Sequence, residues 1–297
     1  MNRLSHFQKK LNRIYSPHKE NLYSHRFFLD ICSGYSFILG NNKGDDFYSF
    51  EPPKCEMERL LNGTNYYFSH TIEQRVSELI SDIIQYGKAY IYIRPEYKVH
   101  KEKDGQNLET LFGIILEVVK GFVLQNHDKT IFYEKGYDGQ VKERILSNNE
   151  LIIFDIKKLG FRKNYFMKMV KKLGSVDMTS SSLMLTGKVK GYDFLDHYNK
   201  YRIKELKVTK DIGWAFRINE LSESYILYKK IQQNKLKIKI LNYVIERINE
   251  GISTYLQNED VGKLVANIKD IQYDQCWNDF KNGKISITEL SKILFSE

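Results

Sequence analysis

Apolar residues recur at helical spacing between positions 71 and 86 of the chain. Thr71 and Gln74 stand three residues apart at the start, in the arrangement of a capping box that closes the first turn of a helix. One side of this stretch is apolar, because it carries Ile72, Val76, Leu79, Ile80 and Ile83. The pattern predicts an amphipathic helix that begins at Thr71 and ends at Gly87.

After Gly87 the pattern changes to short runs rich in β-branched and aromatic residues. The first run covers 88–94 and is closed by Pro95, a residue that cannot sit inside a central strand. Turn residues separate most of the later runs, which lie at 112–119, 122–125, 130–134, 141–145 and 151–156. The charged segment 98–107 is expected to be an exposed loop. Together these runs predict a meander of short antiparallel strands.

Helical patterns dominate the C-terminal half of the chain. Residues 162–173 form a basic amphipathic pattern, and residues 192–207 also show helical spacing. The longest candidate runs from about 221 to 250, with Ser222 as its N-cap and Gly251 just beyond its end.

Shorter candidates complete the picture. Residues 57–61 predict one short helix, and the residues from Ser286 to Glu289 are expected to open another near the end of the chain. The predicted fold class is therefore α+β, with a helix followed by an antiparallel strand meander and long helices in the C-terminal half. We expect three regions, 1–70, 71–160 and 161–297.

Composition narrows the class of protein. The 297 residues are 42% hydrophobic and 28% charged, which is typical of a globular chain. No apolar run approaches the roughly 20 residues of a membrane helix, so no membrane partner is expected. Cys32, Cys55 and Cys276 are far apart and match neither a metal-binding nor a disulfide spacing, which favours a cytoplasmic location. The net charge of +9 is consistent with a polyanionic partner or with a general bias for solubility.

Two groups of cations are candidates for nucleic-acid binding. The first lies between Asp155 and Asp177, where no acidic residue intervenes, and consists of Lys157, Lys158, Arg162, Lys163, Lys168, Lys171 and Lys172. The second lies on the predicted long helix and consists of Lys229, Lys230, Lys235, Lys237 and Lys239. Such groups can neutralise phosphates without reading a base sequence, and they can equally be solvated helix faces.

A metal-dependent nuclease is an alternative. The apolar run at 151–154 ends in Asp155 and Lys157, an Asp-x-Lys pattern that resembles half of the PD-(D/E)xK nuclease motif. In this hypothesis Asp155 and Asp138, with Glu117 as a third carboxylate, would hold Mg²⁺, and Lys157 would activate water. No cofactor is expected otherwise.

The residues from Glu78 to Ile93 resemble the helix–Gly–x–Ala–Tyr–strand signature of tailed-bacteriophage portal proteins. The preceding residues Met57 to Asn65 are similar to that family's short helix, which ends in Leu-Leu and an Asn turn. The run from Asn148 to Phe154 resembles the strand where the family's chain leaves its meander, and Asn282 to Leu290 is similar to a late Gly–x–x–Thr–x–Glu turn. The resemblance covers about residues 27 to 165.

The resemblance implies a ring-shaped homo-oligomer, usually of twelve copies, at one vertex of a phage capsid. Double-stranded DNA would pass through the ring during packaging and ejection, and terminase and head-completion proteins would dock on it. Such a protein has no catalytic residues and is found in the host cytoplasm and the virion. A basic nucleic-acid-binding protein without catalysis is a further alternative.

Overall fold

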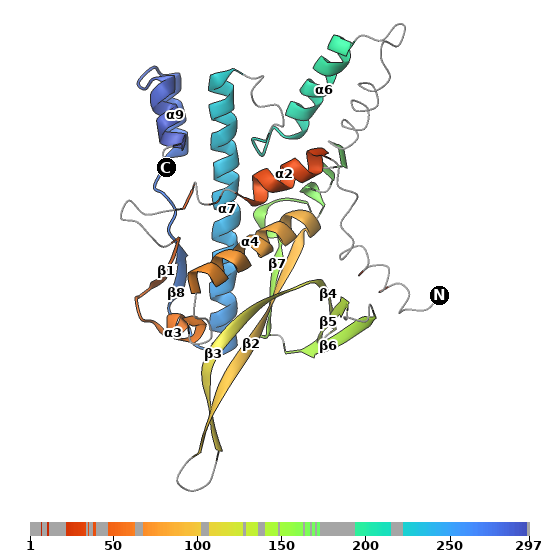
Figure 1. Cartoon of the computed structure of the whole chain (residues 1–297), viewed down its shortest axis with the longest axis vertical. Helices are drawn as coiled ribbons and strands as arrows, with labels where there is room; N and C mark the ends of the chain where they lie inside the picture. Colours follow the sequence, from red (N-terminus) through yellow and green to blue (C-terminus); the bar gives the residue numbers. More distant parts are fainter. Residues whose placement is uncertain are drawn as a thin grey trace. The chain divides into compact units, whose positions relative to one another are not determined.

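The computed structural model describes Phe7, Leu11 and the ranges 22–33, 35, 38–39, 47–62, 68–101, 107–126, 129–135, 140–147, 149–162, 164–166, 168–169, 171–172, 194–214 and 222–295. Helices and antiparallel sheets make up this part of the chain, so the α+β prediction is confirmed (Figure 1). None of the described helices combines the length and the hydropathy that a membrane span requires.

The chain divides into two compact units. The sheet unit consists of Met1–His18, Asn41–Lys163 and Leu241–Asn267, and the helical unit of Lys19–Gly40, Asn164–Ile240 and Ile268–Glu297. The division does not follow the boundaries expected at 70 and 160, because late segments return to early ones. In the sheet unit, for example, strand β8 (Lys263–Ala266) pairs with strand β1 (Tyr48–Glu51).

Helix α4 (Phe68–Tyr86) is the amphipathic helix that the apolar spacing predicts. All five predicted apolar positions are buried, and α4 packs against the strands β2 and β3. The helix begins at Phe68, three residues before Thr71, so the proposed capping box at Thr71 is wrong. Gly87 ends the helix with a φ of 74°, and the chain turns there directly into β2.

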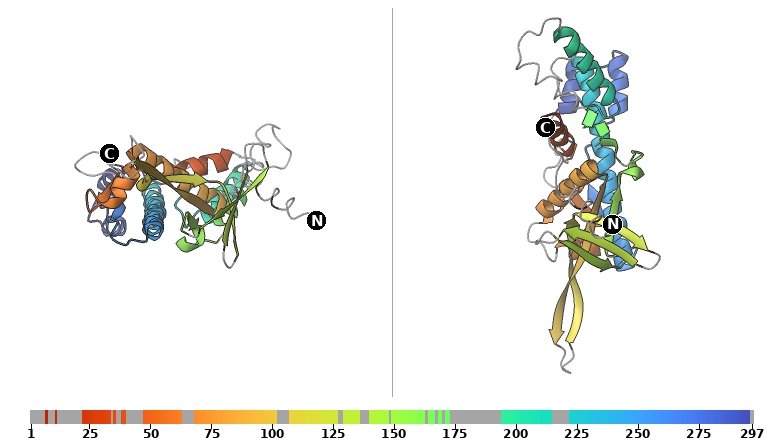
Figure 2. Two further views of the ribbon diagram at one scale, coloured as in Figure 1. Left: turned by 90° about the horizontal axis from the view of Figure 1, so that it is seen from below. Right: turned by 90° about the vertical axis from the view of Figure 1, so that its right-hand side faces the viewer.

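The central sheet of this unit has the strand order β3-β2-β7. Strand β2 covers Lys88–Lys101, β3 covers Asn107–Val119 and β7 covers Leu151–Asp155, all antiparallel. The expected loop at 98–107 is therefore wrong at both ends, since 98–101 and Asn107 belong to paired strands. The strands β2 and β3 twist around each other as a two-stranded ribbon that extends past the end of β7 (Figures 1 and 2).

Pro95 lies inside β2. Its lack of an N–H group removes no hydrogen bond between strands, because no described strand lies opposite it on the side that faces β7. The N–H of Ile93 donates to the carbonyl of Glu150 at 2.8 Å, on the side where β7 lies. Residues two apart in a strand point their N–H groups to the same side, so a donor at Pro95 would point that way as well. Strand β7 pairs with β2 only from Lys88 to Tyr92, and β2 is an edge strand at Pro95 among the described strands.

The remaining strands build a second three-stranded sheet. Its order is β4-β5-β6, with β4 at Gly121–Asn126, β5 at Lys129–Lys135 and β6 at Val141–Leu146. The chain thus leaves the first sheet after β3, forms this meander and returns as β7 on the far edge of β2. Buried residues of the two sheets pack together, namely Tyr90, Val119, Phe132, Leu146 and Leu151. All six strands were predicted, although β2 and β3 are longer than expected, and they form two sheets rather than one meander.

Helix α7 (Glu223–Leu256) is the predicted long helix and contributes residues to both units. Ser222 lies directly before it, as expected. Gly251 does not follow the helix but lies inside it, so its prediction as a C-terminal residue is wrong. A Cβ atom at Gly251 would lie 2.3 Å from Cδ1 of Ile152 in β7. The glycine therefore permits close packing of the helix on the sheet.

The helical unit consists of α2 (Leu22–Cys32), α6 (Phe194–Val208), the first part of α7, α8 (Tyr273–Lys281) and α9 (Ile287–Phe295). One core cluster joins α7 to the last two helices and contains Leu227, Ile231, Tyr273, Leu290 and Leu294. Helix α9 opens with a capping box, since Glu289 accepts from the Ser286 N–H at 2.6 Å and Ser286 Oγ accepts from the Glu289 N–H at 3.2 Å. The expected helix start at Ser286 to Glu289 is confirmed.

Candidate functional site

Asp155 ends β7 and begins the 3₁₀ helix Ile156–Leu159, and its carboxylate is engaged locally. Oδ1 accepts a hydrogen bond from the Lys157 N–H at 3.0 Å, which caps the short helix. Oδ2 lies 3.3 Å from Nζ of Lys88, the residue that faces Asp155 across the strand pair. Lys157 itself is exposed.

The backbone N–H and carbonyl groups of Asp155 also interact with α7. The hydroxyl of Tyr243 on α7 accepts from the Asp155 N–H at 2.9 Å and lies 3.2 Å from the Asp155 carbonyl, to which it can donate. Burial raises the pKa of this phenol. The ring also stands at 90° to Phe154, with 6.4 Å between the ring centroids. Asp155 therefore holds the end of β7 to α7, which is a structural task.

The other members of the nuclease hypothesis do not join Asp155. Glu117 faces Tyr92 in β2, whereas Asp155 faces Lys88, four residues away on the same strand. That spacing alone separates the backbones of the two residues by about 13 Å along the sheet, and they lie on opposite sides of β2, so Glu117 and Asp155 are not placed to share a metal ion. Asp138 lies outside the described residues. Within the described ranges, no group of three or more His, Cys, Asp or Glu side chains could hold a metal.

The first group of cations is divided between the two units. Lys157, Lys158 and Arg162 are exposed on the sheet unit. Lys168, Lys171 and Lys172 are exposed on the helical unit, and Lys163 lies outside the described residues. Phe166 and Met169 are 1% and 4% exposed, so the predicted amphipathic character is confirmed at these positions. The cations are placed where an anionic partner could reach them.

Part of the second group is buried. Lys229 is 1% exposed, so the expectation of a phosphate contact at Lys229 is corrected. Its Nζ has no hydrogen-bond partner among the described residues, and burial lowers the pKa of the amine, while Glu205 and Asp211 oppose this effect. Lys230 is partly buried, its pKa is also lowered by burial, and its Nζ lies 5.6 Å from the ring centroid of Phe295.

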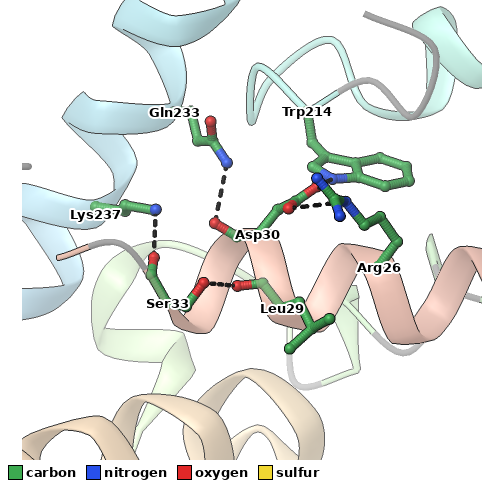
Figure 3. Close-up of polar contacts among 7 residues, drawn as sticks. All are labelled: Arg26, Leu29, Asp30, Ser33, Trp214, Gln233 and Lys237. Atoms are coloured by element: carbon green, nitrogen blue, oxygen red, sulfur yellow. Dashed lines mark hydrogen bonds and ion pairs between the residues drawn. The ribbon is translucent and has the colours of Figure 1, made fainter. Parts of the chain in front are cut away.

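A polar network that joins α2, Trp214 and α7 was not predicted (Figure 3). The Asp30 carboxylate accepts from the Trp214 indole N–H at 2.9 Å and lies 3.1 Å from Nε of Arg26. The Asp30 carbonyl accepts from the Gln233 amide at 3.1 Å. Arg26 and Asp30 are neighbours on one helix, but Trp214 and Gln233 are 184 and 203 positions away from Asp30, so no signal in the sequence could have joined them to it.

Asp82 on α4 is another buried ionisable residue. Its side chain is 8% exposed and lies 3.8 Å from Nζ of Lys120. Burial raises the pKa of Asp82 to about 6, and the nearby Lys120 only partly offsets this effect.

No protein-family model matches the chain, and no curated protein matches it.

Proposed function

We propose that this chain is the subunit of a portal-like ring through which double-stranded DNA passes during phage genome packaging and ejection. The observation that carries the proposal is the junction between Glu78 and Ile93. These residues resemble the portal signature, and they form a helix, a left-handed glycine at Gly87 and the first strand of the central sheet. Terminase and head-completion proteins are the partners that this proposal implies.

The β2–β3 ribbon supports assembly with other copies. On the side of β2 that faces β7, none of the described strands pairs with β2 beyond Tyr92, so this side is an open edge. Tyr97 and Val99 alternate there and are 54% and 57% exposed. An exposed edge with large apolar side chains is a surface that proteins normally pair or cover. Contacts with neighbouring subunits of a ring would cover this ribbon.

The mass of the protein in solution tests the ring. Light scattering with size exclusion should give about 420 kDa for a closed ring of twelve 35.2 kDa chains, because head-to-tail contacts that close yield one defined size. Negative-stain images should show the same particle as an annulus. A mass of one chain that persists at the highest attainable concentration would contradict the proposal.

DNA binding should depend on the exposed cations of the helical unit. Replacing Lys168, Lys171 and Lys172 with Gln should reduce the slope of log affinity against log salt by about two to three, since each phosphate contact releases counterions. Affinity should fall equally for all DNA sequences, because phosphate contacts carry no base information. Fluorescence anisotropy of labelled duplexes across a salt series measures both.

The matched control removes three other exposed lysines of the same unit, Lys281, Lys284 and Lys292. Both triple variants lower the net charge by three. A difference between their salt slopes would therefore come from where the lysines lie and not from the loss of charge. Equal salt slopes for the two variants would mean that the cations at 168–172 are an ordinary solvated face. No observation among the described residues favours the nuclease alternative, in which Asp155 and Lys157 would act with Mg²⁺.

A further inference from the structure

We infer that the end of α2 is held on α7 by a proton-dependent latch, in which protonation of Lys237 favours release of α2 and deprotonation favours its attachment. The latch comprises Asp30, Ser33, Trp214, Gln233 and Lys237 (Figure 3). All five belong to the helical unit. The inference does not depend on the proposed ring function.

The amine of Lys237, on α7, donates a hydrogen bond to a carbonyl group at the C-terminal end of α2. Nζ donates to the Ser33 carbonyl at 2.5 Å, directly after the last residue of the helix, Cys32. Carbonyl groups at the C-terminal end of a helix lack partners within the helix, so they accept a hydrogen bond from the Lys237 amine whether it is neutral or protonated. The Ser33 hydroxyl turns back and donates to the Leu29 carbonyl. Lys237 thus provides the link from this end of α2 to α7.

Lys237 is buried, so a positive charge on its amine is energetically unfavourable. The residue is 3% exposed, and the ring centroid of Tyr35 lies 5.5 Å from Nζ. The charged and titratable groups that face it are Lys230 on its own helix and Asp30 and Cys32 on α2. Asp30 is already engaged by Trp214 and Arg26. Burial, with a smaller contribution from Lys230, lowers the pKa of Lys237 to about 8, against the opposing effect of Asp30 and Cys32.

The direction of the effect follows from proton linkage. A released Lys237 in water has the ordinary lysine pKa of 10.5, and the attached one has a pKa of about 8. Between these values the released state binds more protons, so raising the pH favours attachment. Below pH 8, Lys237 is protonated in both states, and the full free-energy cost of burying its charge opposes attachment. Above pH 10.5, Lys237 is neutral in both states, and this cost disappears. The hydrogen bonds from Trp214 and Gln233 to Asp30 do not involve Lys237, and they hold α2 at every pH in this range.

Native-state hydrogen exchange of the α2 amides measures the latch directly. The protection factors, which are corrected for the intrinsic pH dependence of exchange, should rise about tenfold in α2 between pH 7 and pH 9. The amides of α8 and α9 serve as the internal reference and should not change in this way. Lys237→Met should remove the rise in α2. Lys239→Met, on the exposed side of the same helix, should retain it.

Lys237→Arg provides a second variant, because a guanidinium keeps its charge at pH 9. It should leave α2 protection at pH 9 close to its value at pH 7, and it keeps the inference testable if Lys237→Met does not fold. The inference is overturned if α2 protection in the unaltered protein does not rise with pH. An equal rise in α8 and α9, or a rise that persists in Lys237→Met or Lys237→Arg, overturns it as well.

Discussion

Replacing Trp214 with alanine should lower the free energy of unfolding by about 3–5 kcal/mol, the range for truncating a buried aromatic side chain. Trp214 is 2% exposed, and its ring stands at 87° to Phe27 with 5.4 Å between the centroids. Its N–H also donates to the Asp30 carboxylate. The alanine variant therefore leaves a cavity beside α2 and removes a donor from a partly buried charge. Urea denaturation followed by circular dichroism measures the loss.

Two other variants separate the contributions to this loss. Trp214→Phe keeps a ring beside Phe27 but removes the N–H, and because Asp30 is only partly buried and keeps Arg26, it should cost at most about 1 kcal/mol, the lower end of the range for a buried acceptor that loses its donor. Trp277→Ala removes a tryptophan of the same unit that is only partly buried, against Tyr228 and Phe280. It should cost less than Trp214→Ala. If the two alanine variants were equally stable, Trp214 would not be a central residue of the α2 contact.

Elements that depend on local pattern could be predicted from the sequence. The spacing of Ile72, Val76 and Leu79 identified α4 because a surface helix repeats its apolar face every 3.6 residues. The start of α9 was recognisable because a capping box lies within four residues. The strands β4 to β7 were also found, since β-branched residues between turns mark a strand wherever its partner lies.

Features that depend on distant partners could not be predicted. The pattern at Pro95 indicates the end of a strand, but whether a proline can stay in a strand depends on whether a neighbour needs its N–H. Gly251 has the sequence context of a helix end, and only the proximity of Ile152, about a hundred positions earlier, shows its role. The division of the strands into two sheets likewise follows from the return of β7 to β2.

The candidate site also could be predicted only where a feature depends on one segment of the sequence. The exposure of Lys168 and Lys171 opposite Phe166 and Met169 followed from helical periodicity within one segment. Lys229 and Lys237 look alike in the sequence as parts of a basic helix face, yet both are buried. A lysine on a helix face is exposed only where no other element covers that face, and here distant residues do so, as Ser33 and Tyr35 do at Lys237. Charge counts along one helix cannot reveal this.

Gly213→Ala should lower the free energy of unfolding by about 2–5 kcal/mol, for two reasons that add. Gly213 has a φ of 70°, a conformation that disfavours any side chain. In addition, a Cβ atom there would lie 2.2 Å from the Lys229 carbonyl oxygen and 2.8 Å from the Gln233 backbone nitrogen. Both atoms belong to the backbone of α7, which cannot yield as the end of a flexible side chain could. Thermal and urea unfolding both measure the loss.

Gly283→Ala is the matched control, because Gly283 lies in the same unit with a φ of 71° and nothing lies within 4 Å of its Cβ position. It should cost only the conformational part, about 1–2 kcal/mol. The difference between the two variants then measures how closely the turn at Gly213 approaches α7. Equal losses would contradict that close approach, and they would remove the steric reason for a glycine next to Trp214. A larger loss at Gly213 would mean that the turn before Trp214 packs directly on the backbone of α7.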